Sequence, residues 1–260
     1  MARVVPAVSR AFDILELFLG DRDELTAREI TDALGLPRTT VHELTNTLLE
    51  LGYFTRGTGN RSSFRLGVKV LQLGSAYAER LDLAVEGRSV AEEIVRQCEE
   101  TAHVAVRDGT DVVYVAKVDS TRSVRMVSAQ GRRIPAACTS VGKMLLSALT
   151  RDEIDELYRE PGSLRRMTPN SISTPAQLKR ALAAVRSAGV AFERMESNAE
   201  VACVAAGVYD HTAAMVAAMS ISVPMVRWAD RTEDEWAKLV TVGAQMLSGR
   251  LGARPPQAKG

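Results

Sequence analysis

The first 66 residues place apolar side chains at helical spacing and then switch to short strand-like runs. Apolar residues recur every three or four positions over 7–19. A second amphipathic segment opens at Thr26, with Glu29 three residues later in the position of a capping box, and it closes near Gly35. A third covers 38–51 before Gly52. This pattern predicts three short helices.

Two short strands follow, at 53–55 and 64–66, around a polar turn at 57–60. The order helix, turn, helix, hairpin predicts a winged helix-turn-helix domain, in which 38–51 would enter the major groove of DNA. The alternative is a three-helix packing unit with a solvated outer face.

The net charge of the whole chain differs from that of one of its segments. The whole sequence carries 33 Lys and Arg against 32 Asp and Glu, and this balance argues against a nucleic-acid partner. The segment 51–78, however, contains four cations and no acidic residue, so positive charge gathers on the predicted wing, where phosphate contacts are expected. The candidate DNA-binding residues are Arg38, Thr39, Thr40, His42, Glu43, Asn46, Arg56, Arg61 and Arg65.

The rest of the chain alternates helices and strands. Helices are expected at 86–100, 140–149 and 174–189, and two more begin at 150 and at 232. Strands are expected at 103–106, 112–118, 124–127, 190–194, 202–209 and 214–223. This order predicts an α+β domain with a mostly antiparallel sheet. The predicted partition is a DNA-binding domain over 1–66, a connecting helix over 67–83, an effector domain over 84–250 and a flexible tail over 251–260.

Composition excludes several classes of protein. An apolar content of 46% does not fit a disordered chain, and no segment is long and apolar enough to span a membrane. Three scattered cysteines make no disulfide framework, and they favour a reducing, cytoplasmic compartment. The His and Cys residues lack the paired spacing of a zinc site, so neither a metal nor a cofactor is expected.

Six motifs in order along nearly the whole chain carry a family resemblance. They are LPRTTVHELTNTLLELGYF (36–54), FRLG (64–67), DGTDVVYVAKVDS (108–120), TSVGKMLLSAL (139–149), EVACVAAGVYD (200–210) and MSISVP (219–224). In these motifs the sequence resembles the IclR family of bacterial transcriptional regulators. The resemblance implies a winged helix that dimerises on operator DNA, a linker helix, and a GAF-like C-terminal domain that binds a small metabolite, often in a dimer of dimers.

One position departs from the family pattern. Family members commonly carry a basic residue where this chain has Glu43. A carboxylate repels phosphate but accepts a hydrogen bond from cytosine N4. The family's usual base preferences are therefore not expected to transfer unchanged.

An effector site is predicted from two local patterns. Ser220 and Ser222 stand two residues apart on a strand and so share one face. The sequence from Ser140 begins a helix, whose free N–H groups favour an anion, so a carboxylate ligand is expected. Resemblance to family members that bind small keto acids implies Ser140, Val141, Glu193, Cys203, Ser220 and Ser222 as effector contacts, with Val201 in the pocket wall.

Each of these residues also has a purely structural interpretation. The two serines could satisfy neighbouring strands, and Cys203 could be a small buried apolar residue. Glu193 could instead pair with Arg194 or Lys179 at the surface.

The predicted function is a DNA-binding regulator, not an enzyme, that controls a catabolic operon in response to a small organic or aromatic acid. Two alternatives remain. One is a metabolite sensor that acts through protein contact alone. The other is a hydrolase in which Cys203 is the nucleophile and His103 or His211 the base, although no nucleophile signature surrounds that cysteine. The sequence does not distinguish a repressor from an activator.

Overall fold

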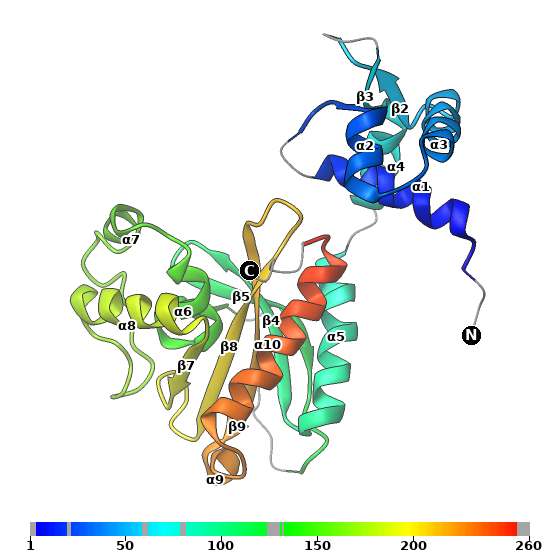
Figure 1. Ribbon diagram of the computed structural model, residues 1–260. Helices are drawn as coiled ribbons and strands as arrows, with labels where there is room; N and C mark the ends of the chain where they lie inside the picture. Colours follow the sequence, from blue (N-terminus) through cyan, green and yellow to red (C-terminus); the bar gives the residue numbers. More distant parts are fainter. Residues whose placement is uncertain are drawn as a thin grey trace. The chain divides into compact units, whose positions relative to one another are not determined.

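The computed structural model divides into two compact units, residues 1–81 and 82–260 (Figure 1). The structure describes residues 4–19, 22–58, 62–78, 82–123, 131 and 133–253. The expected strand at 124–127 and the candidate wing residue Arg61 lie outside these ranges. The linking role expected of 67–83 stays a prediction.

The first unit has the predicted winged helix-turn-helix arrangement. Its elements are α1 (Pro6–Glu16), η1 (Leu17–Leu19), β1 (Leu25–Thr26), α2 (Ala27–Leu34), α3 (Arg38–Glu50), β2 (Phe54–Arg56), β3 (Ser63–Leu66) and α4 (Val68–Ala78). The strands form an antiparallel sheet in the order β1-β3-β2. Strand β1 was not predicted from the sequence, because it is only two residues long.

Local signals fix the helix-turn-helix. The Thr26 hydroxyl accepts from the Glu29 N–H at 3.3 Å, and the Glu29 carboxylate accepts from the Thr26 N–H at 2.8 Å, so the expected capping box begins α2. Gly35, with φ of 64°, ends α2 in the left-handed conformation that glycine adopts without strain. The turn that follows lets α3 begin at Arg38, over a core that includes Phe18 and Phe54.

The second unit is built on a six-stranded sheet. Its helices are α5 (Leu83–Cys98), η2 (Ala136–Cys138), α6 (Ser140–Ser147), α7 (Arg151–Leu157), α8 (Pro175–Ala188), α9 (Met225–Trp228) and α10 (Glu233–Arg250). Its strands are β4 (Thr101–Asp108), β5 (Asp111–Val118), β6 (Arg133–Pro135), β7 (Ala191–Arg194), β8 (Val201–Tyr209) and β9 (Met215–Pro224). They run in the order β6-β5-β4-β9-β8-β7, and every neighbouring pair is antiparallel. The predicted α+β class with an antiparallel sheet is confirmed.

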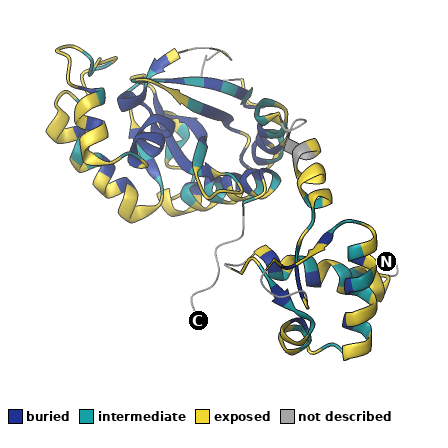
Figure 2. Cartoon of the chain, turned by 90° about the horizontal axis from the view of Figure 1, so that it is seen from above, coloured by how far each residue is buried: buried dark blue, intermediate teal, exposed yellow. Residues whose placement is uncertain are grey.

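Helices cover both faces of this sheet. Figure 1 shows α5 and α10 side by side on one face and α6, with α7 and α8 beyond it, on the other. Buried residues concentrate in the strands and in α6, as Figure 2 shows. The elements β6, η2 and α9 were not predicted from the sequence, because segments of three or four residues are too short to show a period.

Alternation along β9 separates the two faces. Met219 faces the helices α5 and α10, since a Cβ on Gly243 of α10 would lie 2.7 Å from its sulfur. Ala218 packs instead in the core beneath α6, with Leu145 of that helix. Side chains two apart share a face, so Ser220 and Ser222 also face α6.

The strand pair β4–β5 contains a β-bulge. Register pairs Val104 with Ala116 but Ala105 with Tyr114, so the register shifts by one residue at Val115. The extra residue lets Tyr114 join the core beneath α6 while Ala116 lies against α5 on the other face.

Candidate functional site

A band of polar side chains crosses the α6-facing side of the sheet. Register aligns Thr101 of β4, Ser222 of β9, Cys203 of β8 and Glu193 of β7. The next row aligns Lys117, His103 and Ser220. Six of the seven are buried, and Lys117 is half-buried. Buried polar groups destabilise a fold unless they have hydrogen-bond partners, so a band of them in a core indicates a binding site for a polar ligand.

The hydroxyl of Ser222 connects side chains of neighbouring strands in the middle of this band. The Cys203 thiol donates to Ser222 Oγ at 3.2 Å, and Ser222 Oγ lies 3.4 Å from His103 Nδ1. The His103 ring stacks on Tyr114 with 4.4 Å between centroids. Side chains from four strands therefore form one continuous polar layer.

The electrostatics of this layer contradict the hydrolase alternative. Burial, and then the charge of Lys117, lower the pKa of His103 to about 3. Burial, and then the Glu193 carboxylate, raise the pKa of the Cys203 thiol well above its ordinary value. A nucleophilic cysteine needs a lowered pKa and a base able to take its proton. The other proposed base, His211, lies exposed in the β8–β9 turn.

Glu193 belongs to the buried band. Its side chain is fully buried, its Oε1 accepts from the N–H groups of Glu196 at 2.6 Å and Ser197 at 2.9 Å, and its Oε2 has no partner among the described residues. Burial raises the pKa of Glu193.

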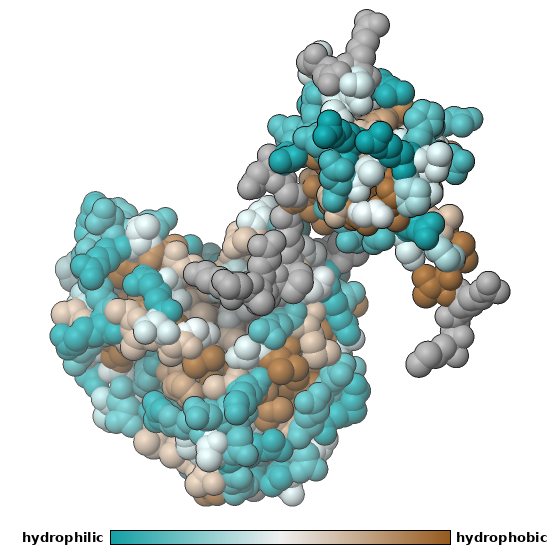
Figure 3. Space-filling view, in the orientation of Figure 1, coloured by the Kyte–Doolittle hydropathy of each residue, from teal (hydrophilic) through white to brown (hydrophobic). Residues whose placement is uncertain are grey.

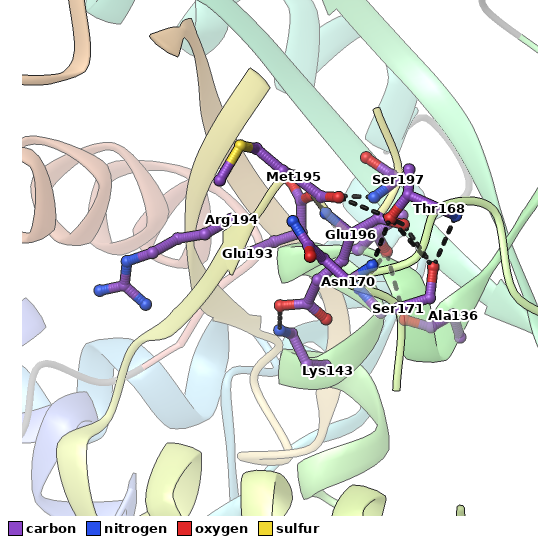
Figure 4. A network of polar contacts seen from close by, with 12 residues as sticks. Ala136, Lys143, Thr168, Asn170, Ser171, Glu193, Arg194, Met195, Glu196 and Ser197 are labelled. Carbon is purple, nitrogen blue, oxygen red and sulfur yellow. Dashed lines mark hydrogen bonds and ion pairs between the residues drawn. The ribbon is translucent and has the colours of Figure 1, made fainter. Parts of the chain in front are cut away.

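The alternative of a surface ion pair for Glu193 was wrong. Arg194 points away from the site in Figure 4 and pairs with Glu233, while Lys179 pairs with Asp155. Alternation along β7 explains this difference, because neighbouring residues on a strand face opposite sides.

Lys143 of α6 is a charged residue of this site that the sequence analysis missed. Its side chain is 6% exposed, and its Nζ lies 2.5 Å from Glu196 Oε1. Glu196 Oε2 is buried without a partner among the described residues. A single lysine within the otherwise apolar helix of motif 139–149 was the available signal.

The turn that carries Glu196 is held in place from outside the sheet (Figure 4). The Thr168 hydroxyl donates to the carbonyl of Met195 at 2.6 Å, and the Ser171 hydroxyl donates to the carbonyl of Glu196 at 2.6 Å. Met195 has φ of 57°, an unfavourable conformation for a residue with a side chain. The two hydroxyl contacts stabilise this conformation.

The first turn of α6 faces the same band. Thr139 caps the helix by accepting from the Gly142 N–H at 2.9 Å, which leaves the N–H groups of Ser140 and Val141 without an acceptor within the helix. The Val141 side chain packs in the apolar core, so only its backbone can meet a ligand. Val201 lies buried with Cys203 in a small apolar cluster.

The DNA-binding candidates on α3 lie on its outer face. Arg38, Thr39, His42 and Glu43 are exposed, and Thr40 and Asn46 are half-buried. Asn46 Nδ2 lies 3.1 Å from His42 Nδ1, so these two side chains contact each other at i,i+4 spacing.

The described wing cations have partners within the protein. The Arg56 guanidinium lies 5.0 Å from the centroid of the Phe64 ring. Arg65 lies 3.8 Å from the carboxylate of Glu24, which also accepts from Ser63 Oγ at 2.7 Å. The positive charge of the wing is therefore partly neutralised at Arg65.

No three His, Cys, Asp or Glu side chains among the described residues are grouped to hold a metal ion. None of the helices in the described ranges is long and apolar enough to cross a membrane.

Comparison with known proteins covers both units. The family model "Bacterial transcriptional regulator IclR C-terminal" matches residues 75–249, and the model "IclR helix-turn-helix domain" matches residues 7–56.

Similar proteins span almost the whole chain. The transcriptional regulator XynR of Escherichia coli K12 is 30% identical over 96% of this chain and 98% of its own length, and KdgR of the same strain is 29% identical over 95% and 93%. The crystal structure of the repressor BlcR from Agobacterium tumefaciens has a TM-score of 0.84 and 28% identity, and the match covers 98% of this chain and 100% of that chain. The chain belongs to the IclR family of bacterial transcriptional regulators.

Proposed function

We propose that this regulator controls a catabolic operon and that a small organic acid, bound at the polar band beneath α6, changes its affinity for operator DNA. The observation that carries the proposal is the band itself, a row of buried polar groups across a sheet whose opposite face is apolar. A ligand shifts the regulator only through different affinities for its DNA-bound and free states.

The donors of the site favour an acid. The hydroxyls of Ser220 and Ser222 lie on the sheet, and the N–H groups of Ser140 and Val141 lie at the N-terminus of α6. The ammonium of Lys143 is the buried cation beside them. Hydrogen-bond donors and a cation together suit a carboxylate.

A thermal-shift screen of the full chain against organic and aromatic acids tests the effector. The panel includes 4-hydroxybenzoate, the compound in the solved complex of an IclR homolog from Microbacterium hydrocarbonoxydans that shares this fold at 24% identity and a TM-score of 0.58. We expect the double variant Ser220→Ala with Ser222→Ala to lose the shift and to keep DNA binding. Ser187→Ala, an exposed serine on α8, is the control. A double variant that responds like the parent contradicts the site.

Operator binding is tested on genomic fragments selected by the purified protein. Arg38→Ala and Arg61→Ala should weaken binding and lower the dependence of log affinity on log salt by about 1 for each lost phosphate contact. Arg28→Ala, an exposed arginine on α2 that pairs with Asp32, is the matched control. Unchanged affinity in both test variants contradicts the assignment of recognition helix and wing.

We also propose that the DNA-binding units act as a homodimer. In α1, Val8 is 52% and Phe12 is 59% exposed, and in α4, Val68 and Leu71 are 67% and 68% exposed. Figure 3 shows apolar side chains gathered over the start of α1. Exposed apolar patches of this kind mark interaction surfaces. Phe12→Glu with Leu71→Glu should yield a smaller oligomer in sedimentation than the parent chain, and an unchanged mass contradicts this interface.

A further inference from the structure

The carboxyl group of Glu193 has one oxygen, Oε2, without a hydrogen-bond partner among the described residues, and this bears on its protonation state. We propose that Glu193 is a neutral carboxylic acid at neutral pH and that its Oε2–H donates a hydrogen bond to an anionic oxygen of the effector. The role as donor rests on the function proposed above, whereas the protonation state is a property of the ligand-free protein. A carboxylate or another oxyanion is the ligand class that this donor recognises.

The two oxygens of Glu193 have different surroundings. Oε1 accepts from two backbone N–H groups, at Glu196 and Ser197, so it behaves as the carbonyl oxygen of an acid. Oε2 is buried and has no partner among the described residues. A proton on Oε2 turns this oxygen into a hydrogen-bond donor that no described residue engages.

The charges around Glu193 favour this neutral form. From its own turn it faces the carboxylate of Glu196, and from α6 the ammonium of Lys143, whose Nζ lies 2.5 Å from Glu196 Oε1. From β8 and η2 it faces the thiols of Cys203 and Cys138, both of which have raised pKa values. Two ionised carboxylates with one ammonium would leave a net negative charge buried.

Opposing effects are present but smaller. The two N–H groups and the Cys203 side chain favour the charged form of Glu193, and burial outweighs them, so the pKa of this carboxyl is raised. The N–H contacts do not require ionisation, because the carbonyl oxygen of a neutral acid accepts the same bonds.

An ionised Glu193 would give the opposite ligand preference. A carboxylate oxygen at Oε2 would accept from a hydroxyl or amine of the ligand and would repel an oxyanion. The protonated form explains how an acidic side chain lies within a site built from donors.

Carbon-13 NMR tests the protonation state without a ligand. The full chain is labelled at glutamate side-chain carboxyls, and the resonance that disappears in Glu193→Gln is assigned to this residue. Glu200→Gln, an exposed glutamate at the end of the same turn, is the control. We expect the Glu193 resonance of a neutral acid at neutral pH. A resonance that titrates near the ordinary glutamate value of 4.5 overturns the proposal.

Calorimetric binding of 4-hydroxybenzoate, or of whichever panel acid gives the largest thermal shift, tests the donor. Parent affinity should fall as Glu193 ionises, by up to about tenfold per pH unit. Glu193→Gln keeps a donor and should lose this pH dependence, whereas Glu193→Ala should bind about tenfold more weakly or worse. A Gln variant that binds no better than the Ala variant overturns the donor role.

The failure of this inference is distinct from failure of the proposed function. A parent chain that binds no acid of the panel contradicts the effector proposal and the donor role together, and the NMR titration still decides the protonation state. A parent chain that binds an acid while Glu193 is ionised contradicts only the present inference.

Discussion

The two faces of the six-stranded sheet are built from the same strands and differ in chemistry. On β9, Met219 and Ile221 are fully buried against α5 and α10, whereas Ser220 and Ser222 lie beneath α6. The face under α5 and α10 stabilises the unit by burying apolar area. The face under α6 contributes less to the stability, because it buries polar groups. This difference supports the proposal that the effector binds on the α6 side of the sheet.

The largest expected effect lies on the polar face. Lys143→Met removes the ammonium that compensates Glu196 and leaves the Glu196 carboxylate without a counter-charge in a largely buried place. The free energy of unfolding should fall by about 3–5 kcal/mol. Urea unfolding followed by tryptophan fluorescence measures this, since both tryptophans, Trp228 and Trp236, lie in the second unit. A loss below about 1 kcal/mol would show that water screens the pair.

A pair of neighbouring substitutions compares the faces directly. Ile221→Ala leaves a cavity under α5 and α10 and should lower the free energy of unfolding by about 2–5 kcal/mol. Ser222→Ala removes one hydroxyl from the polar face and should cost about 1 kcal/mol while it reduces the response to the effector. Equal losses of stability in the two variants would contradict a division of roles between the faces.

Acidification should weaken the polar face through His103. The pKa of this residue is lowered from 6.5 to about 3, so between these values the unfolded chain binds more protons than the folded one. The free energy of unfolding should therefore fall as the pH drops below about 6.5, by up to about 1.4 kcal/mol per pH unit.

Variants of two histidines separate this contribution from others. His103→Gln should remove its part of the slope, and His211→Gln, at an exposed position, is the matched control. Glu193 contributes with the opposite sign. Its raised pKa stabilises the fold at low pH, and this stabilisation is lost as the pH rises from 4.5 through the folded value. A His103→Gln variant with the parent's acid sensitivity would contradict this account.

Elements with local signals were predictable from the sequence. Thr26 with Glu29 forms the expected capping box, Thr232 with Glu235 forms another at the start of α10, and Asp108-Gly109 marks the β4–β5 hairpin. These features depend on residues a few positions apart. The winged helix-turn-helix and the antiparallel sheet follow from them.

The composition of the site was only partly predictable. The sequence indicated Ser220 and Ser222 because a strand's period places them together, but it indicated His103 only as the base of a hydrolase and did not indicate Lys143 or Glu196. Those residues meet the serines through strand register and through the packing of α6 on the sheet. The burial of Glu193 likewise depends on which face of β7 meets α6, and a four-residue strand does not reveal this.

The β-bulge at Val115 bears on how the length of this chain can vary between relatives. Deletion of Val115 would restore regular pairing and leave the other β5 side chains on their present faces. Deletion of Val113, which has a partner opposite it, would exchange the faces of one end of the strand. Deletion of one residue is therefore tolerable at Val115 and disruptive at Val113. In alignments with relatives that are one residue shorter in this strand, we expect the gap at Val115.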